Sequence, residues 1–253
     1  MSQSQSTFEP VARVDSKPLA ERVRLHLLEA ILDGRFAGRL PAEGELARML
    51  DVSRTTLRTA LHGLERDGVV TRRRAVGTTI NAHVSPAALA WHRLVDFDWV
   101  LQKTGYSVEV EITAATGPAP ADAATIFSIP DTTTCFTTTR AYRADGEVAV
   151  WIRDIVPLAS LPGGAPPGAP PRSLPDLARR YGRRPIDHAV ARVAAAVKRP
   201  DSGSTTALPL ADGEPFTRLC ETHYGADAEI FGYSIIDVDD RFLRLEMFRR
   251  TGS

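Results

Sequence analysis

The chain has 253 residues, enough for two ordinary domains, and its 31 basic residues balance its 31 acidic ones. The apolar content of 43% fits a globular protein, and no apolar run approaches the roughly 20 residues that a membrane span requires. The two cysteines, Cys135 and Cys220, form no CxxC pair and there is no histidine cluster, so we expect no disulfide framework, no metal and no cofactor.

The charge is unevenly distributed along the chain. Residues 1–83 hold 13 Lys and Arg against 10 Asp and Glu, whereas residues 84–253 hold 18 against 21. Six of the arginines fall within residues 54–74, which favours phosphate contact in that stretch. Residues 1–16 have neither the basic start nor the apolar core of a signal peptide, and we expect a disordered leader on a cytoplasmic protein.

Three helices are predicted in the N-terminal third. Residues 17–33 repeat apolar side chains at a helical period, which indicates one buried face. A second helix begins near Glu43, whose carboxylate suits the positive end of a helix. After a short turn, Ser53 is a good N-cap for a third helix over residues 54–66.

The third helix leaves four polar residues exposed at its N-terminal end: Arg54, Thr55, Thr56 and Arg58. In a helix-turn-helix this end enters the DNA major groove, where arginine bonds guanine and threonine contacts a thymine methyl group or a phosphate. Taken alone, a charged helix start is more often a solvated face. The β-like runs at 69–71 and 77–80 favour the first interpretation, because with the arginines 72–74 between them they predict a wing that contacts phosphate or the minor groove.

Residues 17–81 resemble the DNA-binding domain of the GntR family of transcriptional regulators. The matching motifs are L-P-x-E-x-E-L-A from Leu40, V-S-R-x-T-x-R-x-A-L from Val52, L-x-x-x-G from Leu64 and G-T-x-[IV] from Gly77. The resemblance implies a winged helix-turn-helix over residues 17–82 that binds double-stranded DNA. The candidate DNA-contacting residues are Arg54, Thr55, Thr56, Arg58, Arg72, Arg73, Arg74 and Gly77.

Two positions depart from the family pattern. Gly44 stands where the family often has an arginine that contacts DNA, and Ala75 stands where it usually has glycine at the wing tip. Both departures shift the expected electrostatic contribution onto the arginines 72–74.

Residues 83–104 are expected to link this domain to a second one over residues 105–253. A strand at 106–112 and a hairpin turn at Asp145-Gly146 are the clearest signals, and the Pro-rich stretch 157–175 predicts an irregular loop. The other expected strands are 134–144, 147–156, 186–197, 216–224, 229–238 and 242–248, and the expected helices are 120–127, 174–181 and 200–207. This order predicts an antiparallel sheet with helices on one side, and hence an α+β fold.

The second domain is similar to the UTRA domain of the HutC branch of GntR proteins, which shares its fold with chorismate lyase. The similarity rests on R-x-x-x-x-D-G-E from Arg140, Tyr181-Gly182, Leu208-Pro209, Tyr233-Ser234 and Asp240-Arg241-Phe242. It implies a small-molecule effector, commonly anionic, that is held by an R-x-R pair.

Arg140 matches the first arginine of that pair, and Tyr142 stands at the second. Arg153 is a substitute for the missing charge, because a guanidinium holds a carboxylate or phosphate by two bonds. Ile152 and Gly232 occupy positions that are often polar in the branch. The candidate effector-binding residues are Arg140, Tyr142, Arg153, Glu221, His223, Tyr233 and Ser234, and a structural or surface role is the alternative for each.

The leading hypothesis is a homodimeric, metabolite-responsive repressor. It would bind a palindromic operator until an acidic or polar effector shifts the dimer to a geometry that no longer fits the DNA. The alternative is an enzyme, or a ligand-binding protein without DNA function, on the chorismate-lyase-like fold. The sequence offers that alternative no metal cluster, phosphate loop or serine elbow.

Overall fold

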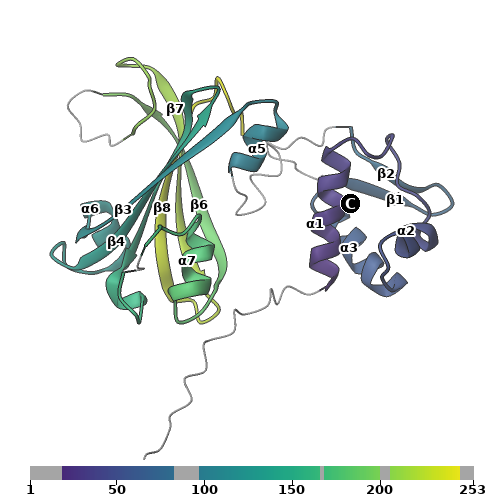
Figure 1. Cartoon of the computed structure of the whole chain (residues 1–253), viewed down its shortest axis with the longest axis horizontal. Helices are drawn as coiled ribbons and strands as arrows, with labels where there is room; N and C mark the ends of the chain where they lie inside the picture. The colour runs from purple at the N-terminus through teal and green to yellow at the C-terminus, as the bar shows by residue number, and fades with distance from the viewer. Residues whose placement is uncertain (1–18, 83–96, 166–167, 200–205, 246–253) are drawn as a thin grey trace, which may run out of the picture. The chain divides into compact units, whose positions relative to one another are not determined.

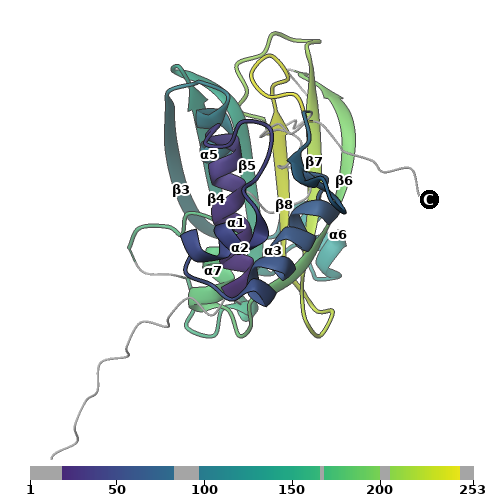
Figure 2. The same cartoon turned by 90° about the vertical axis from the view of Figure 1, so that its right-hand side faces the viewer.

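The computed structural model describes residues 19–82, 97–165, 168–199 and 206–245. The chain divides into two compact units, whose described parts are residues 19–82 and 97–245. Figures 1 and 2 together label the helices and strands of both units. Each unit has its own apolar core.

The first unit is a three-helix bundle with a two-stranded wing. Its elements are α1 (Leu19–Leu32), α2 (Glu43–Met49), α3 (Arg54–Arg66), β1 (Val70–Arg73) and β2 (Gly77–Ile80). The apolar face of α3, which includes Leu57, Leu61 and Leu64, is fully buried. Before α2, the backbone N–H of Leu40 donates to Thr78 at 3.0 Å, so the segment that leads into α2 is attached to the wing. These bounds agree closely with the predicted helices, and the fold is that of a winged helix-turn-helix.

The second unit is built on one six-stranded antiparallel sheet in the order β3-β4-β5-β8-β7-β6. Figure 2 shows these strands from β3 at one edge to β6 at the other. The strands are β3 (Val108–Pro118), β4 (Thr134–Ala144), β5 (Glu147–Pro157), β6 (Ile186–Val197), β7 (Pro215–Gly225) and β8 (Ile230–Val238). The helices are α5 (Phe97–Lys103), α6 (Ala121–Phe127), the 3-10 turn η1 (Leu158–Ser160) and α7 (Leu174–Tyr181).

Helices cover both faces of the sheet, so the prediction that they lie on one side is wrong. On one face, α5 packs over the middle strands at one end of the sheet, and α7 packs near Phe136 and Val156 at the other end. On the opposite face, α6 packs against Ile155 and Ile235. A strand alternates its side chains between two faces, and both faces of the central strands carry apolar residues that need cover.

The hairpin between β4 and β5 turns at Asp145 and Gly146, as predicted. Their φ angles of 50° and 92° are the left-handed values that a tight two-residue turn requires. A β-bulge between Tyr142 and Arg143 then shifts the register, so that Arg140 pairs with Ile152. This one-residue shift decides which β5 side chains share a face with Arg140.

The C-terminal strand expected over residues 242–248 does not form in its described part. The backbone N–H groups of Phe242 and Leu243 both donate to the carbonyl of Asp239, which turns the chain back. Leu243 thereby enters the core beside α5, and Phe242 packs edge-on against Tyr106. Burial of these apolar side chains explains the pattern that suggested a strand. The expected helix at 200–207 lies mostly outside the described residues, as do the leader and the first part of the linker.

Candidate functional site

The exposed start of α3 is organised by its N-cap. Ser53 Oγ accepts a hydrogen bond from the Thr56 backbone N–H at 3.0 Å, and the Thr56 hydroxyl lies 2.8 Å from the same oxygen. Thr56 is therefore engaged with the cap, whereas Arg54, Thr55 and Arg58 are exposed to solvent. The cap satisfies a backbone donor that would otherwise be free and fixes where these three side chains leave the helix.

Gly44 has a structural role next to Arg54. A Cβ atom placed on Gly44 would lie 3.2 Å from Arg54 Nη2, a tight contact. The glycine that replaces the family's usual arginine thus leaves room for the Arg54 guanidinium above α2. Glycine at position 44 therefore removes one predicted DNA contact, and it also leaves the space that the Arg54 side chain occupies.

Glu43 connects the helix to the wing. Its two carboxylate oxygens accept from Arg58 at 2.7 Å and from Arg72 at 2.6 Å. The bond from Arg58 lowers the pKa of Glu43, partial burial opposes this effect, and Arg72 adds to the lowering. Two of the predicted DNA contacts are therefore tied to one carboxylate, while Arg73 and Arg74 are exposed.

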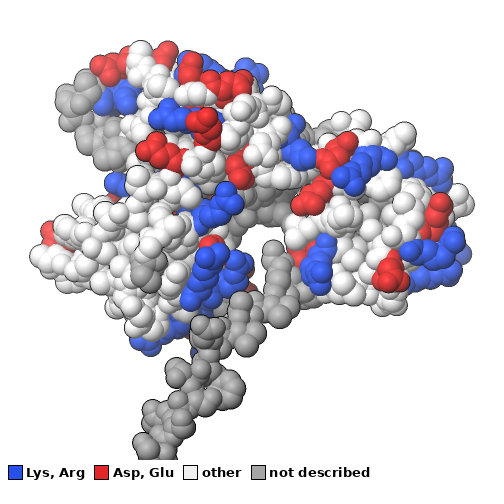
Figure 3. Space-filling model, in the orientation of Figure 1, with Lys and Arg blue, Asp and Glu red and all other residues white. Residues whose placement is uncertain are grey.

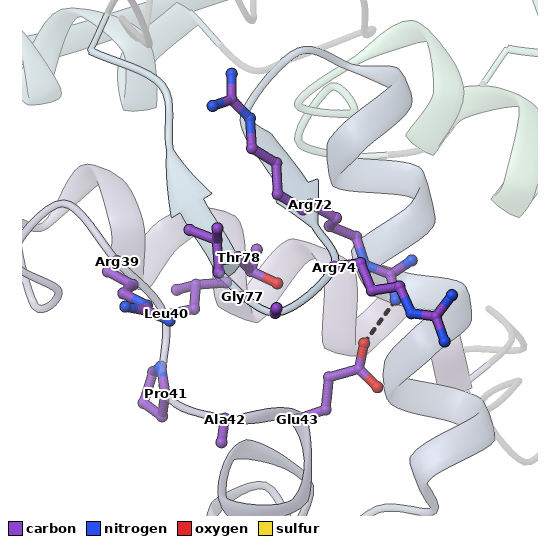
Figure 4. A pocket seen from close by; sticks show the side chains of 12 residues that line it. Arg39, Leu40, Pro41, Ala42, Glu43, Arg72, Arg74, Gly77 and Thr78 are labelled. Atoms are coloured by element: carbon purple, nitrogen blue, oxygen red, sulfur yellow. Dashed lines mark hydrogen bonds and ion pairs between the residues drawn. The ribbon is translucent and has the colours of Figure 1, made fainter.

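A groove of about 660 Å³ runs between the wing and the start of α2, and Figure 4 shows its lining with the Glu43–Arg72 bond. Arg39 lines this groove with the arginines 72–74. Its guanidinium is so close to Gly77 that a Cβ atom there would lie 2.7 Å from Arg39 Nη2. Arg39 was not among the predicted DNA contacts, because it reaches the wing through its pairing with Thr79, far along the chain. Figure 3 shows Lys and Arg side chains gathered at the wing end of this unit.

A second cluster lies buried in the sheet of the other unit. Arg140 Nη1 lies 2.6 Å from Asp154 Oδ2, and the Ser234 hydroxyl donates to Asp154 Oδ1 at 2.6 Å. Ser234 Oγ in turn lies 2.9 Å from His223 Nε2, and a Glu221 carboxylate oxygen lies 3.5 Å from the same nitrogen. The five side chains form one continuous polar chain across β4, β5, β8 and β7.

Burial shifts the pKa values of Glu221 and His223 in this cluster. Burial, and secondarily the negative charge of Asp154, raises the pKa of Glu221 to about 7. Burial lowers the pKa of His223 to about 4, although Asp154 opposes the shift, and Arg140 acts in the same direction as burial. Near neutral pH, His223 is therefore a neutral imidazole, and Glu221 is close to half-protonated.

Four of the seven candidate effector residues belong to this cluster: Arg140, Glu221, His223 and Ser234. Tyr142 lies on the same face as Arg140, where its ring packs edge-on at 6.0 Å from Phe97 in the core. Asp154, which holds the cluster together, was not among the candidates. The unpredicted bulge in the β4–β5 hairpin brings it beside Arg140.

Arg153 and Tyr233 lie on the opposite face, so the prediction that they line one site with Arg140 is wrong. Arg153 pairs with Asp122 of α6 at 3.4 Å, and Tyr233 packs in the core beneath α6. Burial and the neighbouring Cys220 raise the pKa of Tyr233. Arg153 therefore does not replace the second arginine of the family's pair. The Ile152 side chain is 4% exposed and belongs to the apolar core.

The Ser234–His223–Asp154 arrangement lacks the connectivity of a hydrolytic triad. In such a triad the carboxylate orients the histidine, which accepts the serine proton. Here the Ser234 hydroxyl donates its hydrogen bond to Asp154 and not to His223, and the pKa of His223 is lowered. Within the described ranges, no group of three or more His, Cys, Asp or Glu could hold a metal ion, and no helix is long and apolar enough to cross a membrane.

A winged helix with exposed arginines, on one chain with an α+β domain that buries a polar cluster, is the architecture of a two-domain regulator. Residues 19–80 match the bacterial regulatory proteins of the GntR family, and residues 103–236 match the UTRA domain. The second match alone covers more than half of the chain. The chain therefore belongs to the GntR family and carries a UTRA domain.

Similar proteins are also regulators by name. The chain is 35% identical over 136 residues to the HTH-type transcriptional regulator Rv0494 of Mycobacterium tuberculosis, a match that spans 52% of each chain. It is 39% identical over 77 residues to the HTH-type transcriptional regulator GgaR of Escherichia coli, which covers 29% of this chain and 30% of that protein. The chain thus spans about half or less of the curated relatives it matches.

Two solved structures share the fold over almost the whole chain. The possible transcriptional regulator YydK from Bacillus subtilis is 14% identical with a TM-score of 0.64, over 92% of this chain and 100% of that one. PhnF from Mycobacterium smegmatis is 21% identical with a TM-score of 0.51, over 91% of this chain and 100% of that one. At these identities the similarity shows the fold alone.

Proposed function

We propose that this protein is a cytoplasmic, sequence-specific transcriptional repressor that an effector releases from DNA. The observation that carries the proposal is the Ser53-capped start of α3, which presents Arg54, Thr55 and Arg58 to solvent beside a wing with two exposed arginines. In winged helix-turn-helix proteins this end of the reading helix contacts base edges, and wing arginines bind phosphate or the minor groove. Arg39 adds a further positive group at the wing.

The proposed repressor is a homodimer on a palindromic operator. Support comes from the two edges of the sheet. The β3 edge carries Glu109 and Glu111, charges of the kind that discourage edge-to-edge pairing. The 12-residue β6 edge instead exposes Val190, Val193 and Val197 by 40–50% and is otherwise rich in alanine. We propose that β6 is covered by a second copy of the chain, because an exposed apolar edge strand is a ready surface for pairing.

The UTRA domain would bind the effector at the buried cluster around Arg140. Binding there would favour one arrangement of the dimer, and the DNA affinity would fall only to the extent that the effector prefers that arrangement. The enzyme alternative has no support from the relatives, which are named as regulators.

DNA selection from a random library with the full-length protein tests the proposal. We expect a palindromic consensus, and Arg58→Ala should weaken its binding roughly tenfold or more in fluorescence anisotropy. Arg66→Ala is the matched control, because Arg66 is exposed at the far end of the same helix. Selection of no consensus, or equal losses in the two variants, would contradict a reading role for the start of α3.

A further inference from the structure

The groove between the wing and the start of α2 (the wing groove) carries more positive than negative charge. It is lined by one carboxylate, Glu43, and by four arginines, Arg39, Arg72, Arg73 and Arg74. Three of these arginines are exposed, and Arg72 is partly buried beside Glu43. A surface of this kind attracts the backbone phosphates of DNA, whatever the base sequence. A repressor with such a surface needs a feature that limits its affinity for arbitrary DNA, because non-specific sites far outnumber operators.

Glu43 binds two of the arginines that are proposed to contact DNA. Arg58 Nε donates to one carboxylate oxygen at 2.7 Å, and Arg72 Nη2 donates to the other at 2.6 Å. Figure 4 shows the Glu43 carboxylate reaching across the wing groove to Arg72. The bond from Arg58 lowers the pKa of Glu43, so the carboxylate is ionised near pH 7. One of its oxygens is therefore occupied by the reading helix and the other by the wing.

A DNA phosphate that binds Arg58 or Arg72 must replace one of these bonds. The Arg58 side chain is 66% exposed and that of Glu43 is 28% exposed, so the exchange takes place at the surface. It substitutes one charge-assisted hydrogen bond for another and brings little net gain. On arbitrary DNA, the two arginines therefore contribute less than unpaired arginines would, and the affinity depends mainly on the exposed arginines of the wing groove.

An operator base can offer Arg58 a better partner than a phosphate does. In the major groove, guanine O6 and N7 accept two hydrogen bonds from one guanidinium. This bidentate contact would replace the single bond that Glu43 accepts from Arg58 Nε. Arg72 keeps its own bond to Glu43 in that exchange, so the wing stays attached to α2. The exchange is thus favourable on the operator and close to neutral elsewhere.

We propose that Glu43 is a positioning residue that sets the specificity of DNA binding: it holds Arg58 and Arg72 back from the phosphates of arbitrary DNA and releases Arg58 to a guanine of the operator. This inference rests on the proposed function, and it assigns Glu43 to the discrimination between DNA sequences. Glu43 acts through the two arginines and contacts no base. Loss of its charge should therefore raise non-specific binding and lower the ratio of operator to random affinity.

Fluorescence anisotropy of the full-length protein with a random-sequence duplex, over a series of salt concentrations, tests the proposal. We expect Glu43→Gln to bind this duplex roughly three- to tenfold more tightly than wild type. Its slope of log affinity against log salt should be steeper by about 1–2, because each further phosphate contact adds about 0.9. The matched control is Glu45→Gln, which removes the same charge from the same helix at an exposed position outside the wing groove. It should change both quantities much less.

A second set of variants shows whether Glu43 acts through the two arginines. In a protein that already carries Arg58→Ala and Arg72→Ala, the further change Glu43→Gln should affect binding of the random duplex no more than Glu45→Gln does. An effect as large as in the wild-type background would overturn the proposal, because Glu43 would then act on the DNA without the arginines.

The ratio of operator to random affinity completes the test. With an operator duplex obtained by DNA selection, this ratio should fall roughly threefold or more in Glu43→Gln and stay near the wild-type value in Glu45→Gln. An unchanged ratio, equal salt slopes in the two variants, or weaker binding of both duplexes by Glu43→Gln would overturn the proposal. Selection of no consensus would contradict the proposed function instead, and the salt slopes on the random duplex would still test the role of Glu43.

Discussion

The ion pairs at the candidate sites of the two units lie in opposite environments. In the winged helix, Arg58 is 66% exposed and shares Glu43 with Arg72, so its ion pair lies at the surface. In the sheet domain, the Arg140–Asp154 pair is almost completely buried. Exposed pairs contribute little to stability and can exchange partners, which suits side chains that are proposed to bind phosphate. Buried pairs are costly to break, so they fix the geometry of the side chains that form them.

Because the Arg140–Asp154 pair is buried, substitution of Asp154 should cause the largest loss of stability among the proposed variants. Asp154→Asn leaves the Arg140 charge buried without its counterion, and the loss of one partner of a buried pair costs about 3–5 kcal/mol. Urea unfolding followed by tryptophan fluorescence reports on this unit, which contains Trp99 and Trp151. The control is Asp122→Asn, because Asp122 is 41% exposed and its pair with Arg153 contributes about 1 kcal/mol or less. Equal losses in the two variants would remove the contrast.

The buried cluster also makes the stability of the protein depend on pH, through Glu221. Its pKa of about 7 in the folded protein exceeds the ordinary 4.5, so the folded state binds more protons between these values. Its contribution to the free energy of unfolding therefore falls as pH rises from 4.5 through 7, by up to about 3 kcal/mol. We expect Glu221→Gln to be more stable than wild type at pH 8 and equal to it near pH 4.

Urea titrations of both proteins at several pH values measure this difference. The lowered pKa of His223 acts in the opposite direction between pH 4 and 6.5, but it is common to both proteins and cancels in the comparison. Glu229→Gln should show no pH-dependent gain, because Glu229 is exposed. A gain for Glu221→Gln that is the same at pH 4 and pH 8 would contradict an unpaired buried carboxylate.

The sequence predicted the winged helix well, because local signals determine it. Helical periodicity, the Ser53 cap and the turn residues lie within a few positions of the elements they specify. The helix α3 was therefore predicted with its observed bounds of Arg54–Arg66. Arg39 could not be found in this way, because it reaches the wing only through pairing with Thr79, 40 residues further along the chain.

The proposed effector site was predicted less well, because it depends on register between strands. Without the bulge at Tyr142, the Asp145-Gly146 hairpin would pair Arg140 with Trp151 and place Arg153 on the same face as Arg140. The bulge shifts the pairing by one residue and replaces Arg153 with Asp154, which reverses the charge beside Arg140. Tyr233 and Ser234 were both chosen as ligand contacts, although neighbours on a strand face opposite sides.

The smallest expected change in stability is at the wing tip of the first unit. Ala75 has a φ of 65°, a left-handed value that costs a residue with a Cβ atom about 1–2 kcal/mol and costs glycine nothing. Glycine also loosens the unfolded chain by about 0.4–1 kcal/mol. Ala75→Gly should therefore stabilise the wing by about 0.5–1 kcal/mol, which hydrogen exchange of the β1 and β2 amides would measure in the full-length protein.

Ala37→Gly provides the matched control for the wing. Ala37 is also an exposed alanine of the first unit, but its φ is not positive. Glycine there relieves no strain and should lower the free energy of unfolding by a few tenths of a kcal/mol or more. If Ala75→Gly also destabilises, the Ala75 methyl group makes contacts that outweigh its backbone strain. Alanine in place of the family's usual glycine would then stabilise the wing tip.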